Sequence, residues 1–461
     1  MVHRTGVRKP TVDIPMDKIA YFFMFAVFIP ADSTSGRLHS LDRMQRLEII
    51  CSNDSQYEIL RSYENHTDFE FVSCRHNFDN HTEVYVAANS LDSFKEELRT
   101  HSIEFNVLND NIAELAKNQT SRQKREIPNG FYDFGHFPSY NEIKSHLQQL
   151  AGIYGNFVHA FSIGKSFEGR DIMGIKIISG IKRKPILLID GGIHAREWIA
   201  PTTALYAIEK FIKARIQGQF SPDIDIYIIP LLNPDGYEYS RSSSRARLWR
   251  KNRSNFGSTC LGADLNRNFD IGWGGAGASS NPCSSEFAGV YPFSEPENQA
   301  LRDFFKSHGH LIKVYLNLHS YMTSILYPWG VQNLSSPYNS ETLNKLSTEA
   351  AVAMETYRGT RYNFGSIRDV VKGGATGSSI DWSMATGTSY ASFAFELPGK
   401  AYGFFAPASE IIPIGEESFK GFMVFARFVE SISSALPSFI ENSRIQEDVI
   451  PLKTNLSYPR P

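Results

Sequence analysis

Cysteine, an excess of charge of one sign, and long apolar runs are all scarce in this sequence of 461 residues. Four cysteines are too few for the dense disulfide framework of a small secreted scaffold. A formal net charge of −2 gives no basic surface for nucleic-acid phosphates, so we expect no nucleic-acid binding. With 42% hydrophobic and 21% charged residues, the composition is that of a globular protein.

The apolar run Ile19–Ile29 is shorter than the roughly 20 residues that a membrane-spanning helix needs, so we expect no stable membrane span. Lys18 precedes it, and the small residues Ala31 and Ser33 follow. This pattern predicts a signal peptide within residues 1–35, with an N-terminal extension if Met16 is the true start, and hence a secreted, extracellular protein. An uncleaved anchor and a buried helix remain the alternatives.

The cysteines and glycosylation signals are compatible with secretion. Cys260 and Cys283 are close enough in the chain to form a disulfide in an oxidising compartment, and Cys51 and Cys74 could pair similarly. Asn-x-Ser/Thr acceptor triplets, which predict a glycoprotein, begin at Asn53, Asn65, Asn80, Asn118, Asn252, Asn333 and Asn455.

A polar stretch, Asn118–Gly130, separates two regions of different pattern. It carries the basic cluster Arg122–Arg125, which resembles a furin-type processing site with cleavage after Arg125; a solvated charge run is the alternative. We therefore expect a pro domain at 36–125, a catalytic domain at 126–434 and a C-terminal tail at 435–461 for which the sequence indicates no function.

The region before this stretch alternates short apolar strands with amphipathic helices. The order is βαββαβ, which predicts a small open-sandwich α+β domain of ferredoxin-like type. Its predicted strands are Leu47–Cys51, Phe69–Val72, Val84–Ala87 and Phe105–Leu108, and its predicted helices are Ser55–Tyr63, Ser93–Leu98 and one after Asn111.

Beyond the linker, strands alternate with long helices, which predicts an α/β fold with a mixed, mainly parallel central sheet flanked by helices. Ser139 and Glu142 form a capping box that opens the first helix. The predicted strands are Ile172–Ile178, Ile186–Ile189, Ile224–Leu232, Lys313–Leu318 and Ser392–Phe395. Ligands of open α/β sheets bind beyond the carboxyl ends of the strands, so the residues that follow each strand matter most.

Histidine and glutamate follow three of these strands. His194 and Glu197 come after the second, His319 after the fourth and Glu396 after the fifth. Two histidines and one glutamate form a recognised catalytic zinc set, which leaves one coordination position for water, and a further carboxylate can serve as base. The same His-x-x-Glu spacing occurs at His101–Glu104 without a nearby histidine, and we interpret that copy as incidental.

The segment from about Gly130 to Ser434 resembles the zinc carboxypeptidases of the A/B family, and the N-terminal unit resembles their activation segment. The motifs that carry the resemblance occur in the family's order. They are DGGIHAREWIAP (190–201), NPDGYEYS (233–240), RLWRKNRS (247–254), GADLNRNFD (262–270), LHSY (318–321), SIDWS (379–383) and FAFEL (393–397).

The resemblance implies one zinc ion per chain on His194, Glu197 and His319, with Glu396 as the catalytic base. It also implies that Asp264 orients the first histidine. The implied activity is hydrolysis of the C-terminal bond of peptides and proteins, made as a zymogen whose propeptide acts as intramolecular inhibitor until an activating protease removes it. We expect a monomer.

Recognition of a free C-terminus calls for arginine, whose planar guanidinium matches a carboxylate. The resemblance implies that Asn266 and Arg267 anchor the substrate carboxylate and that Arg250 stabilises the oxyanion. Further substrate contacts are implied for Arg196 and for Tyr321 of the LHSY motif.

Ile380 stands where B-type members carry an acid, so we expect an A-like pocket for apolar or aromatic C-terminal residues, enlarged by Ala394. The family's mobile tyrosine is missing between Gly365 and Trp382, where Lys372 or Gly373 takes its place. The alternatives are therefore a catalytically weak, zinc-retaining peptide-binding pseudo-enzyme and a hydrolase of small N-acyl amino acids.

Overall fold

The computed structural model describes residues 40–64, 66–72, 81–120, 131–178, 180, 184–332, 334–371 and 374–434, all within one compact unit, Ser35–Pro461. The predicted signal peptide, Arg125 and the C-terminal tail lie outside the described residues. So do Cys74 and the residue pair Lys372 and Gly373. None of the described helices is both long and apolar enough to cross a membrane.

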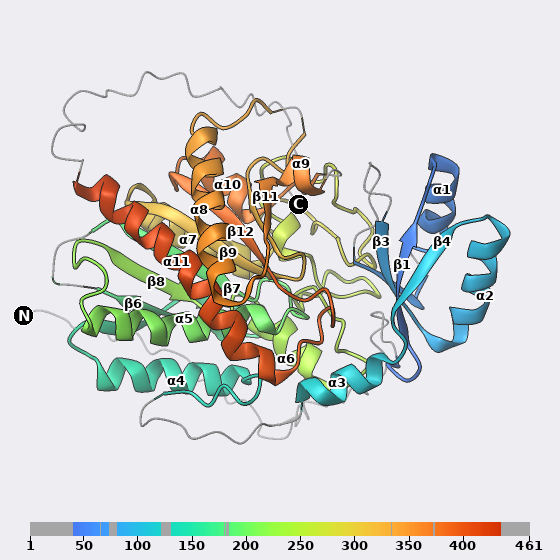
Figure 1. Ribbon diagram of the computed structural model, residues 1–461, viewed down its shortest axis with the longest axis horizontal. Coiled ribbons are helices and arrows are strands. Elements are labelled where there is room, and N and C mark those ends of the chain that lie inside the picture. The colour runs from blue at the N-terminus through green and yellow to red at the C-terminus, as the bar shows by residue number, and fades with distance from the viewer. Residues whose placement is uncertain are drawn as a thin grey trace, which may run out of the picture. The chain divides into compact units, whose positions relative to one another are not determined.

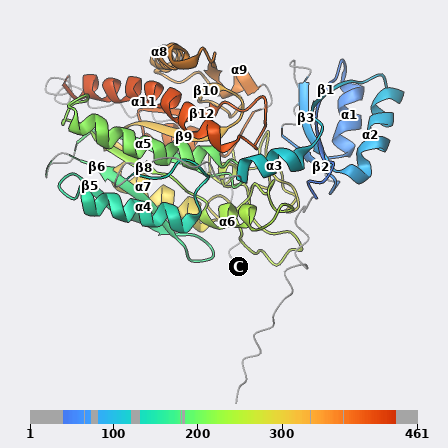
Figure 2. The same cartoon turned by 60° about the horizontal axis from the view of Figure 1, so that its bottom comes forward.

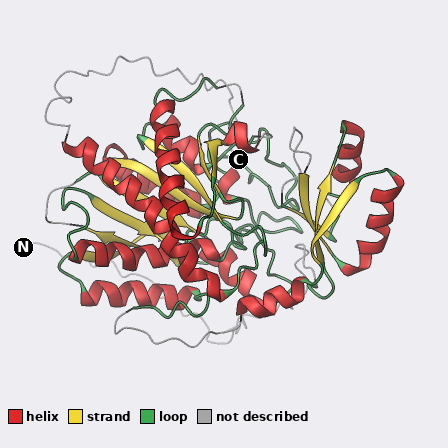
Figure 3. Cartoon of the chain, in the orientation of Figure 1, coloured by secondary structure: helices red, strands yellow, loops and turns green. Residues whose placement is uncertain are grey.

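The described residues before the linker form a four-stranded antiparallel sheet in the order β2-β3-β1-β4, with helices α1 and α2 packed on one face (Figure 3). This confirms the predicted βαββαβ order. The elements are β1 (Gln45–Ile50), α1 (Asp54–Ser62), β2 (Phe69–Phe71), β3 (His81–Val86), α2 (Ala88–Thr100), β4 (Glu104–Asn109) and α3 (Ile112–Thr120).

Alternation along β1 explains this small core. Leu47 and Ile49 point to the helices and pack with Leu60 and Phe94, whereas Arg46 and Glu48 point to the opposite face because successive side chains alternate along a strand. The polar face of the sheet is therefore available to contact the rest of the chain.

The larger sheet has eight strands in the order β11-β10-β12-β9-β7-β8-β6-β5. Four of its neighbouring pairs are parallel (β10–β11, β12–β9, β7–β9 and β7–β8) and the remaining pairs are antiparallel, which confirms the predicted mixed, mainly parallel sheet. Its strands are β5 (Val158–Lys165), β6 (Asp171–Ile177), β7 (Ile186–Gly191), β8 (Asp225–Ile229), β9 (Ile312–Ser320), β10 (Ser324–Tyr327), β11 (Asn363–Ser366) and β12 (Ala391–Leu397).

Helices cover both faces of this sheet (Figure 1). Leu187 and Ile189 of β7 face one core, which α5 and α11 cover side by side (Figure 2), whereas Leu188 faces a second core that contains Phe305. The helices are α4 (Tyr140–Ile153), α5 (Ile199–Ile216), α6 (Pro234–Ser242), α7 (Pro296–His308), α8 (Ser340–Arg358), α9 (Ile367–Val371), α10 (Ser379–Ala385) and α11 (Ile411–Ser434), with short 3-10 turns at Leu265–Arg267, Gly309–Leu311 and Ala408–Glu410.

The two predicted cysteine pairings have different outcomes. Cys260 and Cys283 form the predicted disulfide. Cys51 is buried and free, and its proposed partner lies outside the described residues. Among the acceptor triplets, Asn252 is fully buried and donates hydrogen bonds to Glu295 and Glu297, so its amide is inaccessible to a glycan in the folded chain.

The predicted capping box at the start of α4 is present, and it generates a pH-dependent prediction. Glu142 accepts a hydrogen bond from the Ser139 backbone and contacts His136, and these partners outweigh burial and lower the pKa of Glu142 from 4.5 to about 2. A lowered carboxyl pKa stabilises the fold above the unfolded-state value, and this stabilisation is lost as the pH falls from 4.5 toward 2.

We therefore expect Glu142→Gln, which keeps the capping-box acceptor but removes the negative charge from the first turn of α4, to lower the free energy of unfolding by about 1 kcal/mol at neutral pH. The difference from wild type should shrink as the pH falls below 4.5, measured by thermal unfolding. The control is Glu349→Gln on the exposed surface of α8, which should have little effect at any pH. A difference that grows in acid would contradict the assignment.

Candidate active site

The residues predicted to follow the strands meet at one edge of the large sheet. His319 lies near the end of β9, and the parallel register pairs it directly with Glu396 of β12. β7 is the other neighbour of β9, and the chain leaves β7 at Gly191 to enter the loop that carries His194 and Glu197.

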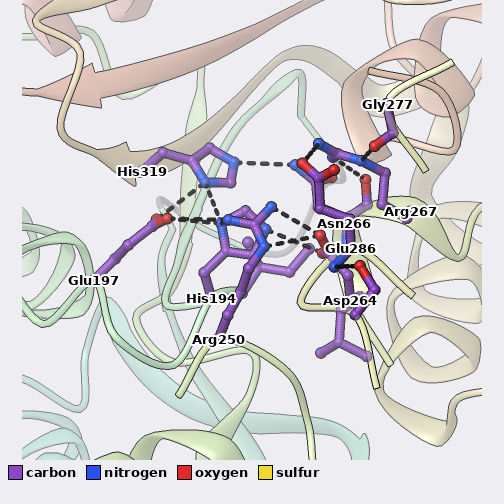
Figure 4. A network of polar contacts seen from close by, with 12 residues as sticks. His194, Glu197, Arg250, Asp264, Asn266, Arg267, Gly277, Glu286 and His319 are labelled. Carbon is purple, nitrogen blue, oxygen red and sulfur yellow. Dashed lines mark hydrogen bonds and ion pairs between the residues drawn. The ribbon is translucent and has the colours of Figure 1, made fainter. Parts of the chain in front are cut away.

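Three of these side chains form a tight, buried cluster (Figure 4). The candidate ligand atoms of His194, Glu197 and His319 all lie within 4.8 Å of one another. His194 Nδ1 is 2.8 Å from Glu197 Oε1, and His319 Nδ1 is 3.2 Å from Glu197 Oε2 and 3.1 Å from His194 Nδ1. The two imidazoles outweigh burial and lower the pKa of Glu197, so this carboxylate stays ionised.

This donor set fits a zinc ion. Two imidazole nitrogens and a carboxylate are ligands that zinc prefers, and tetrahedral ligands on bonds of about 2.1 Å stand about 3.4 Å apart. His319 Nδ1 lies 3.1 Å from His194 Nδ1 and 3.2 Å from Glu197 Oε2, which approaches that value, and the 2.8 Å between His194 Nδ1 and Glu197 Oε1 is shorter. The site is thus a His–Glu–His centre consistent with one zinc ion. In the other His-x-x-Glu pair, His101 follows the last residue of α2 and Glu104 begins β4, and both are exposed.

A carboxylate and an arginine lie behind His194. Asp264 Oδ1 is 3.2 Å from His194 Nε2, and Arg250 donates from Nε to Asp264 Oδ2 over 2.9 Å. Arg250 and His194 outweigh burial and hold the pKa of Asp264 well below its usual value. The ionised Asp264 therefore favours a proton on Nε2, which leaves the lone pair of His194 on Nδ1, the atom that faces the cluster.

Glu396 lines the cavity beside the cluster. Its Oε2 is shielded from solvent and has no hydrogen-bond partner among the described residues. Burial, reinforced by the nearby Glu197 and opposed by His319, raises the pKa of Glu396 to about 7. A carboxyl group in this state is suited to accept and return a proton near neutral pH.

Polar side chains predicted to bind substrate line the same cavity of about 700 Å³. Arg250 lies next to the cluster, with a guanidinium nitrogen 3.8 Å from Glu197. Arg267 donates to the carbonyl oxygen of Gly277 and faces Glu286 at 3.6 Å, and Asn266 accepts from the Ser379 backbone.

Part of the cavity lining is apolar. Ile380 lies near the start of α10 and is 2% exposed, and Ala394 belongs to β12. The other apolar side chains of this part of the lining are Leu326, Ile367, Val370, Val371 and Ala375.

The small N-terminal sheet borders the same cavity with its polar face, through residues that include Glu48 and Glu83. Two side chains predicted to bind substrate are engaged by this sheet. Arg196 donates to Glu70 over 2.6 Å in a buried ion pair, and Tyr321 donates to Glu83 over 2.7 Å. A peptide therefore cannot contact these two groups while the sheet is in place.

Sequence reasoning missed two functional candidates. Glu286, three residues beyond the disulfide-bonded Cys283, faces Arg267, and Asn317 bonds the outer nitrogen of His319. Asn317 lies two residues before His319 on β9, so alternation along a strand could have placed both side chains on one face. No comparable signal in the sequence indicated Glu286 as the partner of Arg267.

Comparisons with known proteins agree with this geometry. The model of the zinc carboxypeptidase family matches residues 143–421, and that of the carboxypeptidase activation peptide matches residues 47–119. Carboxypeptidase B of Astacus astacus is 40% identical over 306 residues, which cover 66% of this chain and 100% of that protein. Carboxypeptidase A1 of Bos taurus is 34% identical over 389 residues, 82% of this chain and 91% of that protein.

Among solved structures, thrombin activatable fibrinolysis inhibitor superposes with a TM-score of 0.77 at 33% identity, and the match covers 85% of this chain and 99% of that one. The family matches and the relatives share both the sequence and the fold of the two described domains. The chain therefore belongs to the zinc carboxypeptidase family and carries the family's activation peptide.

Proposed function

We propose that this zinc metallocarboxypeptidase removes C-terminal residues from peptides with His194, Glu197 and His319 as its metal ligands. The observation that carries this assignment is the convergence of their donor atoms within 4.8 Å in a buried cluster. When bound, zinc supplies a Lewis acid that polarises the scissile carbonyl and acidifies a water molecule.

Glu396 is the proposed general base. Its solvent-shielded Oε2 has no hydrogen-bond partner among the described residues, so it is available to take a proton from the attacking water and return it to the leaving amine. Arg250, next to the cluster, donates to the carbonyl oxygen as negative charge develops there. Its pairing with Asp264 keeps the guanidinium in that position.

Arg267 and Asn266 are the proposed anchor for the substrate's terminal carboxylate. A carboxylate that displaces Glu286 gains the planar donor face of Arg267 without a change in the charge of the site. The same arrangement supports an enzyme over the pseudo-enzyme alternative, because ligands, base, oxyanion donor and carboxylate anchor are all retained around one cavity.

The proposed substrates end in apolar or aromatic residues. Ile380 and Ala394 present an uncharged wall, and a buried Lys or Arg side chain would lose its hydration there without a partner.

We also propose that the protein is a secreted zymogen, with a pro domain at 36–125 and a catalytic domain at 126–434. The activation-peptide match, the Cys260–Cys283 disulfide and the apolar run Ile19–Ile29 support this. Inhibition follows from the engagement of Arg196 by Glu70 and of Tyr321 by Glu83.

Glu396→Gln should lower kcat by about 10²- to 10⁴-fold, the usual effect of losing a general base. The zinc content should stay at that of the wild type, because Glu396 is not one of the proposed ligands. Peptide hydrolysis and metal content are measured on the same activated sample, with a chelator-treated sample as the inactive reference. Full activity of the Gln variant would show that another group is the base.

Ile380→Asp should shift the ratio of kcat/KM for peptides ending in Lys over those ending in Phe by at least about 100-fold, because the new carboxylate pairs with the ammonium group in a desolvated pocket. The matched control is Ala394→Ser, which adds polarity to the same wall without charge and should leave the preference apolar. A wild type that prefers Lys or Arg would refute the proposed specificity.

Arg125→Gln should block activation by a furin-type protease, because the basic residue that precedes the proposed scissile bond is lost. Gln123→Asn, an uncharged change within the same cluster, should still be activated. Activity on a peptide substrate is measured before and after proteolysis, and the new N-terminus is determined by sequencing. Full peptide activity in the uncleaved wild type would contradict the zymogen assignment.

A further inference from the structure

The two histidines of the centre are held from behind in different ways. His194 contacts the carboxylate of Asp264 directly. The outer nitrogen of His319, Nε2, instead contacts the amide oxygen of Asn317, and the Asn317 amide nitrogen donates to Asp190 Oδ1 over 2.5 Å. His319 therefore reaches a carboxylate through an intervening amide.

Strand register produces this chain of contacts. β7 and β9 run parallel, and Asp190 is the register partner of Asn317. Tyr315, Asn317 and His319 alternate along β9 and share one face. Tyr315 donates to the second oxygen of Asp190 over 2.8 Å, so both carboxylate oxygens are occupied.

All the members of this chain are withdrawn from solvent. Asp190, Tyr315 and Asn317 are each 0% exposed, and His319 is 2% exposed. A buried carboxylate is costly unless its hydrogen bonds are satisfied, and here the donors come from Asn317 and Tyr315. The arrangement is specific, because no solvent molecule can take the place of either donor without entering the core.

The directions of these hydrogen bonds determine where His319 carries its proton. Asn317 Nδ2 donates to Oδ1 of Asp190 and Tyr315 donates to Oδ2, so Asp190 is the acceptor and the NH₂ group of Asn317 points toward it. The carbonyl oxygen of Asn317 must then point toward His319 and accept from Nε2–H. Asn266 Nδ2 lies 3.3 Å from the same nitrogen but is itself a donor and cannot replace Asn317.

A neutral imidazole protonated at Nε2 has its lone pair on Nδ1, the atom that faces Glu197 and His194. We propose that Asp190 and Asn317 are positioning residues that fix the tautomer and ring orientation of His319 for zinc. This inference rests on the proposed role of His319 as a ligand. In this proposal, His319 is oriented by the amide of Asn317, which is in turn held by Asp190, whereas His194 is oriented directly by the carboxylate of Asp264.

The test measures the zinc dissociation constant of the full-length, uncleaved chain by competition with a chromogenic chelator. Asn317→Leu should weaken zinc binding by about 10- to 100-fold, as loss of an outer partner of a ligating histidine does. The matched control is Asn339→Leu, which removes a buried amide whose hydrogen bond goes to the Tyr390 carbonyl and should leave zinc affinity unchanged.

Exchanging the side chains of residues 190 and 317 distinguishes an effect on the orientation of His319 from an effect on core packing. Asp190→Asn alone frees the Asn317 amide to turn, and we expect weaker zinc binding. Combining Asp190→Asn with Asn317→Asp restores a donor at 190 and an acceptor at 317, so zinc affinity should return to within about threefold of wild type or exceed it, because a carboxylate then contacts His319 directly. This comparison remains informative even if the Leu variant does not fold.

Wild-type affinity in Asn317→Leu, or a double variant no better than Asp190→Asn, would overturn the inference. Failure of the proposed function gives a different result. In that case the wild-type chain binds no zinc, or His319→Ala binds it as tightly as wild type.

Discussion

Two imidazole nitrogens 3.1 Å apart, buried with a carboxylate that stays ionised, constitute the constraint around which this molecule is arranged. Such a cluster is costly to bury without a cation, since its lone pairs and negative charge face one another. The other polar side chains at the carboxyl ends of the strands contact this cluster or its partners. Asp264 and Asn317 orient the imidazoles from behind, and Arg250 balances the negative charge of Asp264.

Apolar and polar side chains alternate along the strands of the N-terminal domain, so its sheet has one apolar face and one polar face. One face of its sheet packs on α1 and α2, which leaves the carboxylates of Glu70 and Glu83 to contact the groups that a peptide would use. These contacts go to Arg196 and Tyr321 and not to the proposed metal ligands, so the domain covers the proposed substrate-binding groups without contacting the His–Glu–His cluster through them.

Much of this arrangement was predictable from the sequence. Apolar runs such as Ile186–Ile189 located the central strands, and the rule that sites lie beyond strand ends brought His194, His319 and Glu396 into one hypothesis. The edge strands β5 and β11 were missed because their residues are partly exposed and lack a clear apolar pattern, and β10, which lies beside β11, was missed because it has only four residues. The pairing of Asp190 with Asn317 depends on register between strands far apart in the chain, which local pattern does not specify. The roles of the individual site residues stay predictions.

The Cys260–Cys283 disulfide joins residues at a sequence separation of 23 and encloses the turn that carries Asp264, Asn266 and Arg267. Oxidative folding and the assembly of the catalytic edge are thereby linked, because the covalent clasp narrows the conformations open to the segment that supports His194. If the chain folded in a reducing compartment, the disulfide would not form. The histidines and glutamates of the site would be present, but the segment that supports His194 would lack its covalent constraint.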